Sequence, residues 1–223
     1  PYALRRLAIG MIKIILENRK TIKLRDLINY SLQLYNEQNL NFNSENTSKD
    51  LAIFLKDRFK NYMKEKNVRQ DIIESSTSSY NIDDILKIYK KASTLNNMIS
   101  KDIGLDVIFI YKRASNILID EINKNNLEIS DIADPGLFKN DFEKKLYKKI
   151  HDIRKEFSSI SRENDYKGLL KSLASAKLEV TEFFENVKVN DADIVIKKNR
   201  LELLKMLCKT FDNYFNFSKI ESL

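Results

Sequence analysis

The chain has 223 residues, 43% of them hydrophobic and 32% charged, and carries a formal net charge of +7. Its four Gly and two Pro are too few for the many turns of a sandwich or barrel, so the composition favours a helical protein. A single Cys excludes an internal disulfide, a single His excludes a metal site built from several histidines, and no apolar run approaches the roughly 18 residues of a membrane span.

Apolar residues at steps of three and four predict helices through most of residues 1–99. In the first helix, the predicted buried face includes Leu4 and Leu7. A Ser/Thr-rich break is expected over residues 75–79. The predicted helices of this region cover 1–18, 22–36, 48–66, 68–74 and 81–99.

Two pairs of carboxylates stand at predicted helix starts, Asp83 with Asp84 and Asp191 with Asp193. Asn81 is expected to cap the first of these helices, so that both carboxylates meet unpaired amide groups of the first turn. Carboxylate pairs also bind divalent ions, but capping explains both pairs fully. No metal site is therefore expected.

Residues 100–223 are predicted to form a helical bundle. Asn140 and Glu143 have the spacing of a capping box at one helix start, and Asn190 and Asp191 stand at the N-cap position of the last helix. The helix before it is expected to bury Leu178, Phe183, Phe184 and Val187. The last helix has its apolar face at Leu201, Leu204, Cys208, Phe211 and Phe215. The predicted helices of this part cover 100–123, 140–164, 166–186 and a final segment within 191–220.

These elements predict an all-α fold of some eight to ten helices, with an N-terminal helical region over 1–99 and a bundle over 100–223. The chain lacks a Gly-rich phosphate loop. His151 is expected to lie exposed among lysines, and Cys208 to be a small buried hydrophobe. No catalytic residue and no cofactor site are therefore expected in this chain.

Five separated phrases carry a resemblance to a known family. They are PYALRRLAIGMIKIILE, FLKDRFKNYMKEKNVRQDIIES, YKRASNIL, DPGLFKNDFEKKLY, and FFENVKV followed by NRLELL and FSKI. In this order they resemble the β subunit of bacterial glycyl-tRNA synthetase. YKRASNIL is also similar to the opening helix of the DALR anticodon-binding fold, a helical bundle found at the C-terminus of arginyl-tRNA synthetases.

The resemblance implies the C-terminal, tRNA-binding part of an enzyme that joins glycine to tRNA(Gly). It implies a cytoplasmic heterotetramer with an α subunit that holds the aminoacylation site, and ATP and Mg as requirements of the full enzyme only. It also implies that the chain is cut from a longer protein, and that residues 1–99 either follow an upstream HD-like domain or include its end.

Reading a single-stranded anticodon requires stacking surfaces, groups that bond base edges, and cations that hold phosphates. The first and last helices of a DALR-like bundle can be neighbours, so their polar residues are expected to form one basic patch. Arg113 and Arg200 have an alternative role as buried pair-formers that tie helices together. The candidate tRNA-binding residues are Lys112, Arg113, Asn116, Lys197, Lys198, Asn199 and Arg200.

Two rival functions remain open. A helical-bundle protein–protein interaction module without nucleic-acid binding predicts a large exposed apolar patch and salt-insensitive binding. An enzyme in its own right ranks last, because the sequence shows no catalytic constellation.

Overall fold

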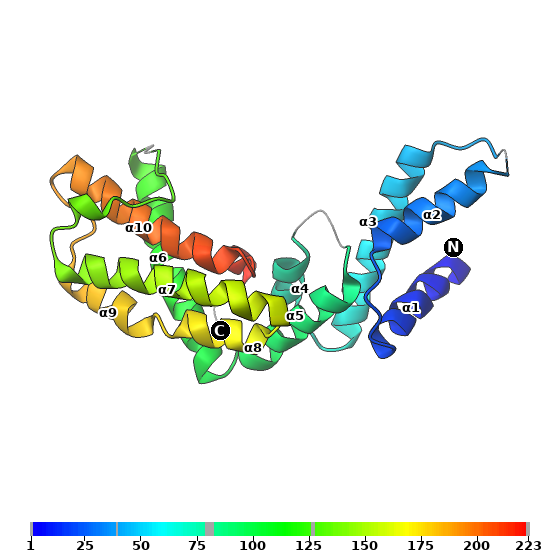
Figure 1. Ribbon diagram of the computed structural model, residues 1–223, viewed down its shortest axis with the longest axis horizontal. Coiled ribbons are helices and arrows are strands. Elements are labelled where there is room, and N and C mark those ends of the chain that lie inside the picture. The colour runs from blue at the N-terminus through cyan, green and yellow to red at the C-terminus, as the bar shows by residue number, and fades with distance from the viewer. Residues whose placement is uncertain (1, 39, 79–82, 126–127, 222–223) are drawn as a thin grey trace. The chain divides into compact units, whose positions relative to one another are not determined.

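The computed structural model forms helices along most of the chain (Figure 1). Within the described residues there are ten α-helices and two short 3-10 helices, and the β-type pairing found there is an isolated bridge between Lys23 and Asp84. The all-α prediction is confirmed. The side chains of residues 125, 158 and 161–163 are not described. The described residues are 2–38, 40–78, 83–125 and 128–221.

The chain divides into two compact units, Pro1–Asn96 and Asn97–Leu223. The sequence predicts a division between residues 99 and 100. In the first unit α3 is central, because α1, α2 and α4 each pack against it. The helices that begin in this unit are α1 (Tyr2–Glu17), α2 (Leu24–Asn36), α3 (Ser44–Glu65), α4 (Gln70–Thr77) and α5 (Ile85–Met98).

The buried face of α1 differs from the predicted one. Ala8, Ile12 and Ile15 are buried, whereas Leu4 and Leu7 are exposed. The prediction for Leu4 and Leu7 is wrong, because α1 packs against α3 and its apolar face is wider than the part that becomes buried. Apolar spacing identifies a helical face, but it does not show how much of that face a neighbour covers.

The Ser/Thr-rich break expected after residue 74 is also wrong in its described part. Ser75, Ser76 and Thr77 form the last turn of α4 and are buried. The Thr77 hydroxyl donates to the Ile73 carbonyl oxygen at 2.7 Å, so its polar group is satisfied inside the helix.

Carboxylate capping is confirmed for the first pair, although the two residues cap different helices. The Asp84 carboxylate accepts from the backbone N–H of Lys87 at 2.9 Å, at the start of α5. The Asp83 carboxylate instead accepts from the backbone N–H of Arg25 at 3.0 Å, in the first turn of α2. The predicted cap at Asn81 lies outside the described residues.

The second unit is a bundle in which α6 and α7 each contact α8, α9 and α10 (Figure 1). Its centre is aromatic, because Phe183, Phe211, Phe215 and Phe217 are all fully buried. The whole predicted face of the last helix is buried. The elements of this unit are α6 (Asp102–Asn125), η1 (Pro135–Leu137), α7 (Asp141–Glu163), α8 (Tyr166–Ala174), α9 (Lys177–Asn186), α10 (Ile194–Asp212) and η2 (Phe217–Lys219).

The capping box of α7 is confirmed in both directions. The Asn140 side chain accepts from the Glu143 N–H at 3.1 Å, and the Glu143 carboxylate accepts from the Asn140 N–H at 3.0 Å. At α10 the N-cap is Asp193, whose carboxylate accepts from the Val195 N–H at 2.8 Å. The prediction of a cap at residues 190 and 191 is therefore wrong by two to three positions.

The segment predicted as one helix over 166–186 is two helices, α8 and α9, with Ser175 and Ala176 between them. Neither residue is a Gly or Pro, so the sequence carries no breaker there. The break changes which residues of α9 face the core, and Leu178 is 66% exposed although the sequence places it in a buried seam.

Candidate nucleic-acid interface

The structure brings α6 and α10 side by side, as the sequence predicts for the first and last helices of the bundle. Lys197 on α10 forms an ion pair with Glu121 on α6, with 2.6 Å between Nζ and Oε2. Both side chains are largely buried. Lys197 therefore joins two helices, and its ammonium group is already paired.

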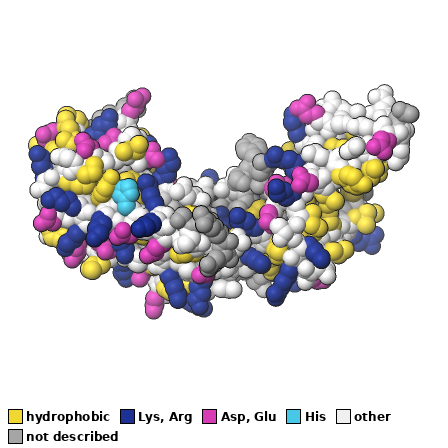
Figure 2. All heavy atoms as spheres, viewed as in Figure 1, with side chains coloured by type: hydrophobic (Ala, Val, Ile, Leu, Met, Phe, Trp, Pro, Cys, Tyr) yellow, Lys and Arg dark blue, Asp and Glu magenta, His cyan; other side chains and the backbone are white. Residues whose placement is uncertain are grey.

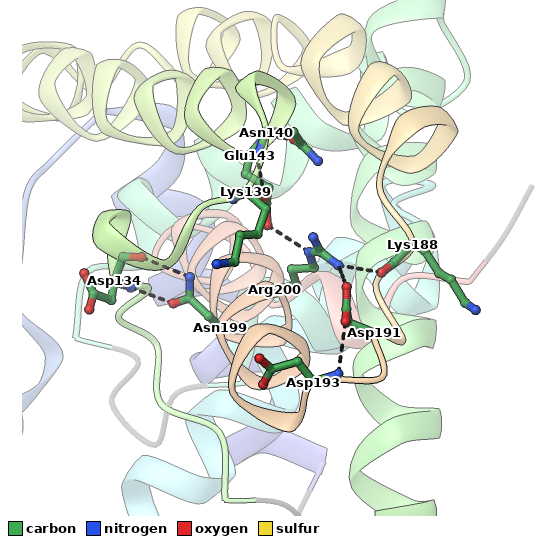
Figure 3. A network of polar contacts seen from close by, with 9 residues as sticks. All are labelled: Asp134, Lys139, Asn140, Glu143, Lys188, Asp191, Asp193, Asn199 and Arg200. Carbon is green, nitrogen blue, oxygen red and sulfur yellow. Dashed lines mark hydrogen bonds and ion pairs between the residues drawn. The ribbon is translucent and has the colours of Figure 1, made fainter.

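Arg200 is the centre of a polar network that joins three parts of the bundle (Figure 3). Its Nε donates to the fully buried carboxylate of Glu143 at 2.8 Å. Its Nη1 donates to the Lys188 carbonyl oxygen at 2.9 Å and to the Asp191 carboxylate at 2.6 Å. Arg200 thus ties the start of α7 and the α9–α10 loop to α10, which is the pair-forming alternative considered from the sequence.

Glu143 is satisfied on both carboxylate oxygens. While Oε1 accepts from Arg200, Oε2 accepts from the backbone N–H groups of Lys139 and Asn140 at 2.7 and 3.0 Å. A buried charge is tolerated only when it is paired and hydrogen-bonded. The network meets this condition, so it is a structural element of the bundle.

The pKa of Asp191 is held below its usual value, first by the hydrogen bond from the Asp193 backbone N–H and then by the bond from the Arg200 guanidinium. The carboxylate is therefore ionised throughout the neutral range. The Asp191 carboxylate thus holds the loop before α10 through two contacts, one with the Asp193 N–H and one with the Arg200 guanidinium.

Asn199 makes a two-way contact with the loop before η1. Its side-chain amide donates to the Asp134 carbonyl oxygen at 3.0 Å and accepts from the Asp134 N–H at 2.7 Å (Figure 3). The residue is only 1% exposed. Its donor and acceptor are thus engaged within the bundle.

The seven residues predicted to contact tRNA therefore fall into two groups. Lys197, Asn199 and Arg200 are buried and bonded internally. Their contact with tRNA stays a prediction, and their internal bonds do not favour it. The side chains that reach the surface, wholly or in part, are those of Lys112, Arg113, Asn116 and Lys198.

Arg113 differs from the two other arginines of the second unit whose side chains are described. Arg154 donates to Thr210 and to the Met206 carbonyl oxygen, and Arg200 donates to its network. Among the described residues, Arg113 has no hydrogen bond or ion pair. Its guanidinium lies over the ring of Phe184, 4.6 Å from the centroid. Its N–H donors remain available to a ligand.

A pocket of about 410 Å³ lies beside Arg113, between α6 and the segment that ends α9. We call it the Arg113 pocket. Apolar groups from Ile117, Phe184, Val187 and Val189 line it, together with the polar residues Arg113, Glu121, Lys188 and Asn190.

The sequence-based prediction missed the loop that forms one side of the Arg113 pocket. Val187 and Val189 are buried, whereas Lys188 and Asn190 between and after them are exposed. This period-two alternation in VKVN is the signal of an extended segment with one buried face. Phe184, predicted to be a core residue, is only half-buried and lines the pocket.

The environments of Tyr111, Cys208 and His151 do not indicate a catalytic role for these side chains. Tyr111 is buried and its hydroxyl donates to Asp212 at 3.0 Å, and burial is the first cause that raises its pKa. Burial likewise raises the pKa of the Cys208 thiol to about 12, as expected for a buried hydrophobe. His151 is exposed and packs on Tyr147, with Lys and Arg side chains around it (Figure 2).

Within the described ranges, no group of three or more His, Cys, Asp or Glu residues is arranged to hold a metal ion. Among the same residues, no helix combines the length and apolar character needed to cross a bilayer.

Comparison with protein families identifies the bundle. The family model of the DALR anticodon binding domain matches residues 107–223, which is more than half of the chain. The chain belongs to the DALR anticodon binding domain family. A second family model, that of the glycyl-tRNA synthetase beta subunit, matches residues 1–78 of this DALR-family chain.

Curated relatives agree with both matches. The chain is 36% identical over 221 residues to the glycine–tRNA ligase beta subunit of Rickettsia canadensis, and 35% identical to those of Rickettsia typhi and Rickettsia prowazekii. Each match covers 99% of the DALR-family chain but only 31% of the relative. The resemblance found in the sequence phrases is thereby confirmed.

Proposed function

We propose that the chain is the tRNA-binding part of a glycine–tRNA ligase β subunit. The observation that carries this proposal is the match of the DALR anticodon binding domain over residues 107–223. The β-subunit match over residues 1–78 supports the choice of ligase. In this proposal the chain binds tRNA(Gly) and holds no catalytic group.

The remaining features of the enzyme are part of the same proposal. The ligase joins glycine to tRNA(Gly) in the cytoplasm, using ATP and Mg²⁺. An α subunit completes the assembly and holds the aminoacylation site.

The surface of the second unit supports binding of a single-stranded anticodon loop. Proteins recognise such loops by stacking on aromatic or Arg planes and by hydrogen bonds to base edges, while cations hold the phosphates. Arg113 lies beside the half-buried ring of Phe184, and the side chains of Lys112, Asn116 and Lys198 reach the surface of α6 and α10.

The direct test is binding of the chain to tRNA(Gly) across a salt series, compared with the same tRNA carrying a changed anticodon. We expect affinity to fall with salt and with the anticodon change. Binding that depends on salt but not on the anticodon would show that the chain contacts the tRNA phosphates without recognising the anticodon bases. Absence of binding at low salt, both for the chain and for the assembled α and β subunits, would refute the proposed function.

A matched pair of lysine variants sharpens this test. Lys198→Met removes an exposed cation at the start of α10, whereas Lys171→Met removes an exposed cation from α8, outside the predicted interface. Each lost phosphate contact lowers the slope of log K against log salt by about 0.7–0.9. We expect that reduction for Lys198→Met and an unchanged slope for Lys171→Met.

The first unit favours a second, protein-binding role for residues 1–96. Apolar side chains gather on the surface of α1–α3 (Figure 2). Large apolar patches on a soluble protein mark protein contacts. The relatives are about three times as long as the chain, since it spans 31% of them, so we propose that the rest of the β-subunit polypeptide covers this surface. The exposed residues include Tyr2, Leu7, Ile14, Leu27, Tyr30 and Ile53.

A single introduced thiol tests this second role. Leu7→Cys places an exposed thiol on α1, while the native Cys208 is buried. We expect the new thiol to react with a disulfide reagent in the 223-residue chain and to be protected in a full-length β subunit. Lys171→Cys is the control and should react in both. Protection that requires the α subunit would assign the surface to that partner instead.

A further inference from the structure

We infer that the Arg113 pocket takes one unstacked base of a single-stranded RNA, with the phosphate of that nucleotide outside the pocket at Lys188. The inference rests on the proposed function and names the chemical group that this site recognises. The volume of about 410 Å³ lies within the roughly 300–1,000 Å³ of ligand pockets.

Two flat side chains line the pocket. The Arg113 guanidinium carbon lies 4.6 Å from the centroid of the Phe184 ring. Any base has a flat π face that stacks on an aromatic ring or on a guanidinium plane. Ile117 and Val187 add apolar contact on other sides.

The polar groups that line the pocket are of the kind that bond a base edge. Arg113 has five N–H donors and, among the described residues, no acceptor for them. The exposed side-chain amide of Asn190 offers both donors and an acceptor. An aliphatic ligand would strip water from these groups without replacing its hydrogen bonds, which is unfavourable.

The charge of the pocket favours a nucleotide over an uncharged ligand. Glu121 lines the pocket, but Lys197 neutralises it at 2.6 Å. Among the described contacts, no carboxylate forms an ion pair with Arg113 or Lys188, so these two residues give the pocket its positive charge. Lys188 lines the pocket and is exposed, so its ammonium group is accessible to a phosphate at the mouth of the pocket.

The Arg200 network holds the pocket in shape before any ligand arrives. Arg200 binds the Lys188 carbonyl oxygen and the Asp191 carboxylate, which fixes the loop carrying Lys188 and Asn190. A site held by buried hydrogen bonds loses less entropy when it binds its ligand.

The test is a double-mutant cycle between the protein and the RNA. Affinity is measured for wild-type chain and Phe184→Leu against tRNA(Gly) transcripts that carry one abasic nucleotide at each anticodon-loop position in turn. Base–aromatic stacking contributes about 1–3 kcal/mol, so we expect Phe184→Leu to weaken binding about 5- to 150-fold. At one RNA position the two changes should be non-additive, because both remove the same contact.

Matched variants exclude a general loss of structure. Phe138→Leu alters another half-buried ring of the same unit, which packs on Tyr147 outside the pocket, and should leave affinity unchanged. Arg113→Lys keeps the charge but removes the planar fork, so it should lose base dependence while keeping the salt slope. Thermal unfolding of each variant is measured alongside.

Each other outcome overturns the inference. If tRNA(Gly) binds but Phe184→Leu and every abasic change are additive, the pocket holds no base, although the proposed function stands. If no tRNA binds to the chain or to the assembled ligase, both fail. Free CMP, GMP or AMP that binds more tightly than the tRNA would assign the pocket to a small nucleotide. Pocket variants that weaken only association with the α subunit would assign it to a protein.

Discussion

Removing Arg200 should strongly destabilise the second unit. In Arg200→Met the fully buried Glu143 keeps its two backbone N–H donors but loses its cation. Removal of one partner of a buried ion pair costs about 3–5 kcal/mol, because the remaining charge is left uncompensated. A loss of 3 kcal/mol corresponds to about a 150-fold change in an equilibrium constant.

Hydrogen exchange measured by mass spectrometry is the suitable assay, because peptides of α10 and of α1 report on the two units separately. We expect amide protection in α10 to fall at least about 150-fold in Arg200→Met. Lys144→Met, which breaks an exposed pair with Asp141, should change the free energy of opening that exchange reports by no more than about 1 kcal/mol.

A second substitution tests the cause of this loss. Adding Glu143→Gln to Arg200→Met removes the unpaired charge, while the amide oxygen can still accept from the N–H groups at the start of α7. The double variant should therefore be more stable than Arg200→Met alone. A fall in protection smaller than tenfold in Arg200→Met, or further loss in the double variant, would refute the reasoning.

Three further predictions follow from single sites. Cys208 should resist a disulfide reagent at pH 8 in the native chain and react fully in denaturant, because burial raises its pKa to about 12. Because the pKa of Asp191 in the fold lies below the ordinary carboxyl value of about 3.9, its ionised carboxylate stabilises the fold at pH values above that. The difference in urea midpoint between wild type and Asp191→Asn should therefore be full at pH 6 and shrink as the pH falls below about 4. Gly104→Ala should be strongly destabilising, because its Cβ would lie 2.2 Å from the Met98 carbonyl oxygen. A Cβ at Gly10 meets no atom within 4 Å, so Gly10→Ala should gain about 1 kcal/mol of helix propensity and raise the thermal midpoint. Similar melting curves for the two variants would contradict this pair.

Local signals in the sequence predict the helices well and their ends less well. The apolar face of α10 and the capping box at Asn140 and Glu143 follow from spacing that a single helix determines. The break between α8 and α9 at Ser175 and Ala176 has no such signal, because neither residue interrupts a helix by itself. Contacts of both helices with α6 and α7 accompany that break, and sequence spacing does not report them.

The candidate site shows the same limit more sharply. Arg113 and Arg200 both lie on amphipathic helices and look alike in sequence. Arg200 is buried because Glu143, which is 57 residues away, meets it across the bundle. Arg113 meets the ring of Phe184 and no carboxylate among the described contacts. Helical periodicity places both residues on a face, but only the tertiary contacts decide which cation is available.

Replacement of Arg200 by Lys should separate the shape of the Arg113 pocket from its charge. A lysine keeps the positive charge beside Glu143, but its single ammonium lacks the planar fork that now reaches Glu143, the Lys188 carbonyl oxygen and Asp191 together. The loop carrying Lys188 and Asn190 should therefore lose its fixed position.

The predicted consequence for Arg200→Lys is specific. Binding of tRNA(Gly) should lose its dependence on the anticodon while its salt slope stays as in the wild type, because the exposed cations are untouched. The measurement is the affinity ratio for native and anticodon-changed tRNA at two salt concentrations, with Lys198→Met as the opposite case. An unchanged ratio in Arg200→Lys would show that the network stabilises the bundle without positioning the loop.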